Sequence, residues 1–252
     1  IMRLPTATNK YDVEAGNNTY DNAVIENSKI SVKNKIQNNQ SMLDDIMNST
    51  QYPKQLKDLA LKNEEALEFV YDYPAEHVKE HTIDLTEEAS MDSVPLFVQW
   101  DKRWGYEKYS GNFFAASGCG PTTLSMVVVY LTHNREASPI AVAKYSKEAG
   151  YSVDGSGSSW TLISEGCMHY GVKAKAVALD ESRMKAELDE GHPIVVNVGP
   201  GDFTDTGHFM VITGYDDEGF SINDPNSIEK SGKRWLFRNI SSQIRAVWSM
   251  YV

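Results

Sequence analysis

The stretch Ala115-Ala-Ser-Gly-Cys-Gly-Pro-Thr-Thr-Leu-Ser-Met126 decides how the whole chain is interpreted. Small residues surround Cys119, and the apolar run from Leu124 to Leu131 predicts a buried helix that begins at the cysteine. Pro121 is tolerated in a first helical turn, because its missing N–H would have no intrahelical partner there. The sequence therefore places one thiol at the N-terminus of a core helix.

This position would activate the thiol. A helix N-terminus carries partial positive charge, which favours thiolate over thiol. Thr122 and Thr123 are expected to supply side-chain oxygens to the unpaired N–H groups of the first turn. Most lone cysteines are small core hydrophobes, but the glycines on both sides of Cys119 remove packing and open the backbone. We interpret Cys119 as a nucleophile.

The C-terminal third supplies a base and an acid. Residues 207–215 predict a strand with His208 at its start, and residues 220–225 predict the strand that returns after a turn. In this hairpin Asp224 lies opposite His208 or one diagonal step away, on the same face. Its carboxylate would accept the Nδ1–H of the imidazole and leave Nε2 facing the thiol. Each residue alone has a structural explanation, but together with Cys119 they form nucleophile, base and orienter.

Four motifs in combination resemble a known family. They are Gln99-Trp100-Asp101, Ser117–Thr122, Gly207-His208-Phe209 and Asn223-Asp224-Pro225. The chain is similar over roughly Val94 to Val252 to stand-alone relatives of the family-39 cysteine peptidases. These bacterial papain-like enzymes are related to the leader peptidases that trim double-glycine bacteriocin precursors. The resemblance implies an α+β fold of papain-like type, with a helical half carrying the cysteine and an antiparallel sheet carrying the histidine and the aspartate.

The resemblance also implies roles for single residues. Cys119 matches the family's nucleophile, His208 its base and Asp224 its orienting acid. Gln99 matches a glutamine whose side-chain amide donates to the oxyanion hole, together with the backbone N–H of the cysteine. Gln99 could equally be a polar residue at the end of a strand that begins at Val94. The papain signature Cys-Gly-Ser/Ala-Cys-Trp/Tyr is absent, so the chain is not a close papain relative.

Length and composition fit one catalytic domain with an appendage. The chain has 252 residues, of which 41% are hydrophobic and 10% aromatic, as in an ordinary globular protein. We expect residues 94–252 to form the papain-like catalytic domain and residues 1–93 to form a tail and a helical extension. The extension is too short and polar to own a large core, so we expect it to rest on the catalytic domain. It could instead be a spacer from a cell surface or a segment that covers the active-site groove.

Local signals predict further elements on both sides of the proposed boundary. Residues 1 to about 25 are expected to be a tail or an extended arm. The later signals predict, in order, helical structure over Ile25–Asp72 with Asn63 as an N-cap and Tyr73-Pro74 as its end, a helix capped by Ser138, a helix opening at Trp160, a strand over Val172–Ala178, a helix capped by Asp180 and a strand over Ile194–Val198. The loops at 155–159 and 199–206 are candidate walls of a substrate groove.

The net charge and the first residues of the chain indicate which partners and which cellular location to expect. The net charge of −11 argues against nucleic acid or anionic membranes as partners, because both need basic patches. No transmembrane segment is expected. The chain starts Ile1-Met2-Arg3, and a removed export signal would place the protein outside the cell or at its surface, which is the location we expect. The expected partner is a peptide or protein substrate, and the sequence does not predict an oligomeric state.

The remaining cysteine and one histidine motif give no second site. Cys167 is expected in the core, free of a disulfide to Cys119. His77-Val-Lys-Glu-His81 fits the inverted zinc-peptidase pattern H-x-x-E-H. Pro74 before it and β-branched residues after it leave too short a helix, so we interpret the motif as a solvated short helix. We expect neither a metal nor a cofactor.

The predicted function is a thiol-dependent hydrolase, a cysteine peptidase that cleaves peptide bonds through an acyl-enzyme on Cys119. Two alternatives remain. One is a non-catalytic module of the same fold that binds peptides, although such a module has no physical need for Cys119, His208 and Asp224 together. The other is an amidase acting on cell-wall peptides with the same triad, which the sequence does not separate from a peptidase.

Overall fold

The computed structural model describes residues 18–252, so the tail predicted for residues 1–17 lies outside the described part. Residues 18–25 are not a tail but the beginning of α1 (Asn18–Asn48). The helix extends over them because this segment contains neither glycine nor proline, the two residues that most disfavour helix.

Short helices and strands follow α1 along the chain. The further α-helices are α2 (Lys54–Lys62), α3 (Leu67–Tyr71), α4 (Tyr73–Glu76), α5 (Phe114–Ser117), α6 (Cys119–Thr132), α7 (Pro139–Glu148), α8 (Thr161–Ser164), α9 (Glu181–Asp189), α10 (Ile228–Ser231) and α11 (Phe237–Ile240). The 3-10 helices are η1 (Glu64–Ala66), η2 (Glu88–Ser90), η3 (Gly166–Tyr170) and η4 (Ser241–Gln243). The strands are β1 (Lys108–Tyr109), β2 (Asn112–Phe113), β3 (Ser152–Val153), β4 (Gly157–Ser158), β5 (Lys173–Ala176), β6 (Ile194–Val198), β7 (His208–Asp216), β8 (Gly219–Asn223), β9 (Arg234–Trp235) and β10 (Ile244–Tyr251).

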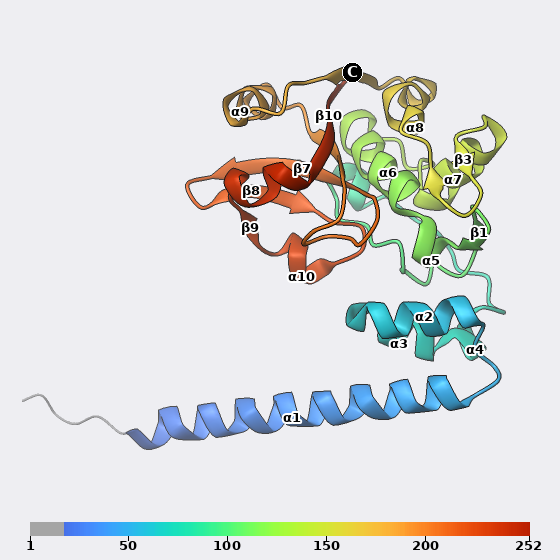
Figure 1. Ribbon diagram of the computed structural model, residues 1–252, viewed down its shortest axis with the longest axis vertical. Helices are drawn as coiled ribbons and strands as arrows, with labels where there is room; N and C mark the ends of the chain where they lie inside the picture. Colours follow the sequence, from blue (N-terminus) through green and yellow to red (C-terminus); the bar gives the residue numbers. More distant parts are fainter. Residues whose placement is uncertain (1–17) are drawn as a thin grey trace, which may run out of the picture.

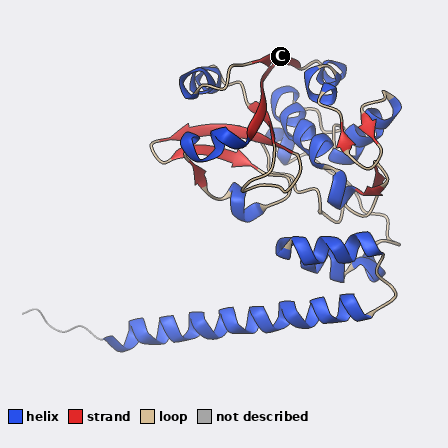
Figure 2. Ribbon diagram, viewed as in Figure 1, coloured by secondary structure: helices blue, strands red, loops and turns tan. Residues whose placement is uncertain are grey.

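One six-stranded antiparallel sheet organises the C-terminal half (Figure 2). Its strand order is β5-β10-β6-β7-β8-β9, so β10 is inserted between β5 and β6. Val198 of β6 pairs with His208, which is the first residue of β7. The strand pair β7–β8 contains a bulge between Ile212 and Gly214 and ends with Val211 opposite Asn223. The start of β7 and the end of β8 therefore lie at the same end of the sheet.

Both faces of the sheet are buried, which explains why β6 is apolar at successive positions. Val195 and Val211 belong to a core cluster that also contains Leu124 and Met126 of α6. The neighbouring residues Val196, Met210 and Ile212 belong to a second cluster, with Met184 of α9 and Ile240 of α11. The alternation follows from the two-residue period of a strand. Helix α6 therefore lies against one face of the sheet (Figure 1), and its first residue, Cys119, interacts with His208, the first residue of β7.

The N-terminal helices α2 and α3 lie between α1 and the rest of the molecule (Figure 1). Their apolar side chains form a third cluster with the end of α1, and this cluster includes Phe113 and Ala115, which lie just before α6. The extension does therefore rest on the part of the chain that carries Cys119. We refer to residues 54–72 as the N-terminal helical unit.

Several predicted boundaries agree with the structure. Ser138 caps α7 by accepting the N–H of Ala141, and Asp180 caps α9 by accepting the N–H of Arg183. The strand predicted at Ile194–Val198 is β6, and Asn63 accepts the N–H of Glu65 as the predicted N-cap of the helical stretch that follows.

Other predicted elements are wrong or incomplete. Residues 94–99 form no strand, because Pro95 has no N–H and the segment is instead held by Asn223, whose amide donates to the carbonyls of Val94 and Pro95. The helix predicted to run to Asp72 does end there, with Asp72 as the C-cap of α3, but Tyr73-Pro74 then starts the unpredicted short helix α4, since proline is accepted in a first turn. The prediction that Trp160 opens a helix is confirmed, since Trp160 is the N-cap of α8; this helix is short and is followed by η3.

Within residues 18–252, every helix is too short or too polar to cross a bilayer.

The third cluster gives a test of how firmly the N-terminal helical unit is anchored. Leu56 of α2 is fully buried, whereas Leu61 of the same helix is exposed. We expect Leu56→Ala to lower the free energy of unfolding by about 2–5 kcal/mol, through lost burial and the cavity left behind. Leu61→Ala, the matched control, should change it by less than about 0.5 kcal/mol. Urea denaturation measures both, and equal small effects would show that α2 does not contribute to the core.

Candidate active site

Cys119 is the first residue of α6 and is partly exposed, at the meeting point of two cavities. The residues before it form the short helix α5, whose end is fixed by the Gly118 N–H donating to the Phe114 carbonyl at 2.7 Å. A side chain at position 118 would collide with the Phe114 ring and carbonyl, so glycine is required there. The sequence thereby forces a tight turn that starts a new helix at the thiol.

The predicted threonine caps are absent. The N-cap of α6 is Gly118, which offers no side chain, and the hydroxyl oxygens of Thr122 and Thr123 are buried with no hydrogen-bond partner in the described part of the chain. Both threonines lie inside the first turns, where they face the core instead of the open helix end. The N–H groups at the start of α6 are therefore not capped by a threonine side chain.

His208 and Asp224 are both buried and form a hydrogen bond of 2.7 Å. The bond joins Asp224 Oδ1 to Nε2 of the imidazole, so the prediction that Nδ1 would face the acid is wrong. The reason is the end of the hairpin. Asp224 lies beyond the last residue of β8, where the chain turns, and its carboxylate reaches the outer tip of the ring. Nδ1 is left as the nitrogen available to the thiol.

Cys119 and His208 are hydrogen-bonded through their side chains. Burial alone would raise the pKa of the Cys119 thiol. The hydrogen bond and positive charge of His208, with the N–H groups of Phe209 and Gly120, outweigh burial and lower that pKa. For His208, burial opposes the charged form, but Asp224 and Cys119 raise the pKa to about 10. The arrangement favours a thiolate beside an imidazolium over a neutral pair.

Gln99 lies in an extended segment next to the same hairpin end. It is buried, its backbone N–H donates to the Pro225 carbonyl at 2.7 Å, and its Nε2 donates to the Ala115 carbonyl at 2.7 Å. Its Oε1 has no partner among the described residues. Gln99 lines one cavity together with Cys119 and His208, so the structure brings all four predicted site residues to one place.

Asn226, which was not predicted as a site residue, gives the Asp224 carboxylate a second hydrogen bond. The backbone N–H of Asn226 donates to Asp224 Oδ1 at 2.8 Å, so this oxygen accepts two hydrogen bonds. An aspartate that accepts the N–H two residues later is a common turn in Asp-Pro sequences, and that signal could have found it. The other oxygen, Oδ2, is buried and unpartnered among residues 18–252.

Cys119 lines two cavities, which differ in most of their other lining residues. The Trp160 cavity, of about 530 Å³, is lined by Cys119 together with Ser156, Ser158, Trp160, Gly199 and Phe209. The α2 cavity, of about 490 Å³, is lined by Cys119 together with His208, Gln99, Asp58, Lys62 and Thr204. Residues from both loops predicted as groove walls, 155–159 and 199–206, line these cavities.

The histidines of the H-x-x-E-H motif belong to no group of three potential metal ligands in the described part of the chain. Residues 77–81 lie after the end of α4 and are not helical, so the predicted short helix is wrong. The ring of His77 stacks on Tyr73 at 4.1 Å and donates to its carbonyl. The ring of His81 donates to the carbonyl of Glu76. Both rings are therefore used in local packing.

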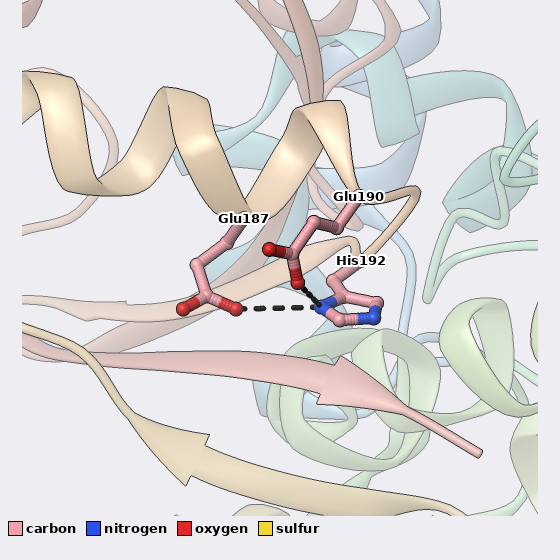
Figure 3. Close-up of side chains that lie close together, drawn as sticks. All are labelled: Glu187, Glu190 and His192. Carbon is pink, nitrogen blue, oxygen red and sulfur yellow. Dashed lines mark hydrogen bonds and ion pairs between the residues drawn. The ribbon is translucent and has the colours of Figure 1, made fainter.

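One group of three potential metal ligands occurs among residues 18–252, formed by Glu187, Glu190 and His192 (Figure 3). Hydrogen bonds from Lys175 of β5 and Ser249 of β10 lower the pKa of Glu187 to about 2. The group lines neither of the two cavities that Cys119 lines. Its bonds tie α9 to two strands, which explains these residues structurally.

Comparisons with known proteins define the class. Helices that carry the cysteine and an antiparallel sheet that carries the histidine and the acid make up an α+β fold of papain-like type. The sequence model of the Peptidase C39-like family matches residues 91–252, and the chain belongs to this family. Among curated proteins, none matches the chain.

Two solved structures are similar to this chain. One is the peptidase domain of Streptococcus ComA, described as a bifunctional ABC transporter involved in a quorum-sensing pathway, with 18% identity and a TM-score of 0.44 over 63% of this chain and 96% of that one. The other is a protein from Bacillus anthracis described as a C39-like peptidase, with 18% identity and a TM-score of 0.39 over 63% of this chain and 95% of that one.

The contact of Cys119 with His208 predicts how the thiol reacts as pH changes. We expect alkylation by iodoacetamide to rise with pH at an apparent pKa below the roughly 8.5 of an ordinary thiol. In His208→Ala the hydrogen bond and charge of the imidazole are lost, and burial is then opposed only by the N–H groups of Phe209 and Gly120, so the apparent pKa should rise above that of the unmodified protein. Rates of Cys119 alkylation, followed by mass spectrometry of the peptide, measure both.

His192→Ala is the matched control, because its ring lies in the group formed with Glu187 and Glu190 and lines neither cavity next to the thiol. It should leave the alkylation profile unchanged. Identical profiles for the unmodified protein and His208→Ala would contradict the thiolate–imidazolium pair.

Proposed function

We propose that this chain is a cysteine peptidase that cleaves peptide bonds through an acyl-enzyme on Cys119. The observation that carries the proposal is the continuous chain of contacts from the lowered-pKa thiol through His208 to the buried carboxylate of Asp224. Membership of the Peptidase C39-like family supports the same reaction class. The proposed reaction uses neither metal nor cofactor.

In the first half of the reaction, the Cys119 thiolate attacks the carbonyl carbon of the scissile bond, and the C=O electron pair moves to oxygen. When the carbonyl re-forms, the C–N bond breaks, and Nδ1 of His208 gives its proton to the leaving amine. Asp224, on Nε2, keeps the ring in the tautomer and orientation that this transfer needs. The product is a thioester on Cys119 and a released amine.

In the second half, water attacks the thioester and loses a proton to His208. The C–S bond breaks, the acyl group leaves as a carboxylic acid, and the thiolate–imidazolium pair is restored. The same histidine therefore acts as acid and then as base, which a ring held by one buried carboxylate can do without moving away.

Two donors are proposed for the oxyanion. The first is the backbone N–H of Cys119, since the first N–H groups of a helix have no partner within it. The second is the side-chain amide of Gln99, which carries two N–H groups and uses one on the Ala115 carbonyl. Because Gln99 lines the cavity shared by Cys119 and His208, the second N–H is available to a substrate bound there.

Gln99 and Cys119 give the direct test of catalysis. We expect Cys119→Ala to abolish cleavage of denatured casein, and Gln99→Ala to lower kcat by about 10²–10³-fold if it donates to the oxyanion. The thiol pKa of Gln99→Ala should be unchanged, because Gln99 is not among the groups that shift it. Product peptides are measured by mass spectrometry. Undiminished kcat in Gln99→Ala would exclude the oxyanion role.

The same experiment separates peptidase from the other two functions. A binding module would bind peptides equally in the unmodified protein and in Cys119→Ala, and would release no products from either. A cell-wall amidase would leave casein intact and release fragments from peptidoglycan in a Cys119-dependent manner.

The α2 cavity is proposed to hold the part of the substrate that leaves as an amine. His208, which protonates that amine, lines this cavity and not the Trp160 cavity. The acyl part then occupies the Trp160 cavity. Asp58 and Lys62 of α2 are the charged side chains that the N-terminal helical unit contributes to the leaving-group side.

Competing amines test this assignment. The acyl-enzyme formed from an N-acetylglycine p-nitrophenyl ester can pass its acyl group to water or to an added amine bound in the leaving-group cavity. We expect Asp58→Asn to reduce transfer to argininamide, and Lys62→Gln to reduce transfer to glutamic acid α-amide, each by about two- to fivefold, as for exposed ion pairs. Transfer ratios are read from product masses, with Lys57→Gln as control because Lys57 is not a lining residue. Unchanged ratios in both test variants would contradict this assignment.

A further inference from the structure

Glu65, in the N-terminal helical unit, forms hydrogen bonds across to the segment that follows Asp224. Its Oε2 accepts the backbone N–H groups of Ile228 at 2.8 Å and Glu229 at 3.1 Å. Its Oε1 accepts the hydroxyl of Ser227. One carboxylate thus takes three donors from three successive residues, and these residues lie more than 160 positions away in the sequence.

Asn63 supports the same contact. Its Nδ2 lies 2.9 Å from the Asn226 carbonyl and 3.1 Å from Oδ1 of the Asn226 side chain. Its own Oδ1 accepts the N–H of Glu65, which fixes the two residues relative to one another. Trp100 donates to the same Asn226 carbonyl at 3.2 Å. Each of the residues 226–229 is therefore held from outside: Ser227 through its hydroxyl and the other three through their backbone.

Residues 226–229 are directly connected to the acid. The N–H of Asn226 donates to Asp224 Oδ1, the oxygen that also accepts from Nε2 of His208. Ser231 closes the turn, because its hydroxyl accepts the N–H of Asp224 at 2.9 Å and donates to the carbonyl of Ser227 at 2.7 Å. A shift of the turn would therefore move the Asp224 carboxylate relative to the imidazole.

We propose that Glu65 is a positioning residue for the active site: it fixes residues 226–229 so that Asp224 holds His208 in the orientation that activates Cys119. The inference rests on the proposed peptidase function. It assigns part of the catalytic apparatus to the helical unit that lies outside residues 91–252, the range matched by the family. Glu65 lines neither cavity beside Cys119, so it acts through Asp224 and not on the substrate.

The test compares two adjacent glutamates. Glu64 is the matched control, because its carboxylate accepts only an exposed hydrogen bond from Asn39 of α1 at 2.7 Å. In Glu65→Ala we expect the apparent pKa of Cys119 alkylation to rise, because the imidazolium loses part of its support. We expect kcat for casein peptides to fall by about tenfold or more, with KM little changed, as for a misplaced catalytic group. Glu64→Ala should change none of these values.

A double-mutant cycle separates positioning from simple stabilisation. If Glu65 acts through Asp224, Glu65→Ala added to Asp224→Ala should produce little further change in the alkylation profile. An equal shift in both backgrounds would overturn the proposal. So would a Glu65→Ala protein that is less stable to heat but has an unchanged Cys119 pKa and unchanged kcat.

Glu65→Gln keeps the experiment decisive if the alanine variant does not fold. The amide preserves shape and one acceptor oxygen, so it should restore part of the activity, with kcat and Cys119 pKa between those of the unmodified protein and the alanine variant. A folded Glu65→Gln protein with unmodified values for both would also overturn the proposal. A normal thiol pKa in the unmodified protein would instead refute the peptidase function, independently of Glu65.

Discussion

The buried hydrogen bond between Asp224 Oδ1 and His208 Nε2 is the interaction on which the site depends. Burial by itself would keep both His208 and Cys119 uncharged, since it raises the pKa of a thiol and lowers that of an imidazole. The Asp224 carboxylate raises the pKa of His208 in spite of burial, and the charged imidazole then lowers the pKa of Cys119. The sheet and α6 position these charged groups, because His208 is the first residue of β7 and Cys119, which it contacts, is the first residue of α6.

The elements around the site were predictable where a short segment determines its own conformation. Gly118-Cys119 could be recognised as a helix start, and the caps Ser138 and Asp180 have side chains that bond to N–H groups three residues later. The pairing of His208 with Asp224 followed from strand spacing. Strand spacing did not show which ring nitrogen of His208 contacts Asp224. That contact depends on how the chain turns after Asn223, beyond the last regular pair of the hairpin.

Other features depended on distant contacts and had no local signal. The segment from Val94 to Gln99 has the composition of a strand, but its carbonyls are taken up by the Asn223 amide. Threonine is a common capping residue, but Thr122 and Thr123 are buried by the packing of α6, and their hydroxyls point into the core. No pattern within ten residues of Glu65 indicates that it contacts Ser227. The long-range hydrogen bonds that connect the N-terminal helical unit to the acid were therefore invisible before the fold was known.

The position of β10 has a consequence for how the protein is made. Strands β6, β7 and β8 are neighbours in both sequence and space, so they can pair as soon as they leave the ribosome. Strand β5 precedes them in the chain but joins the sheet only through β10, which is made last of the three and fits between β5 and β6. Such non-local pairing folds slowly. The strands around His208 can therefore pair before β10 is made, whereas β5 and one side of β6 stay without a partner in a nascent chain that lacks residues 244–251.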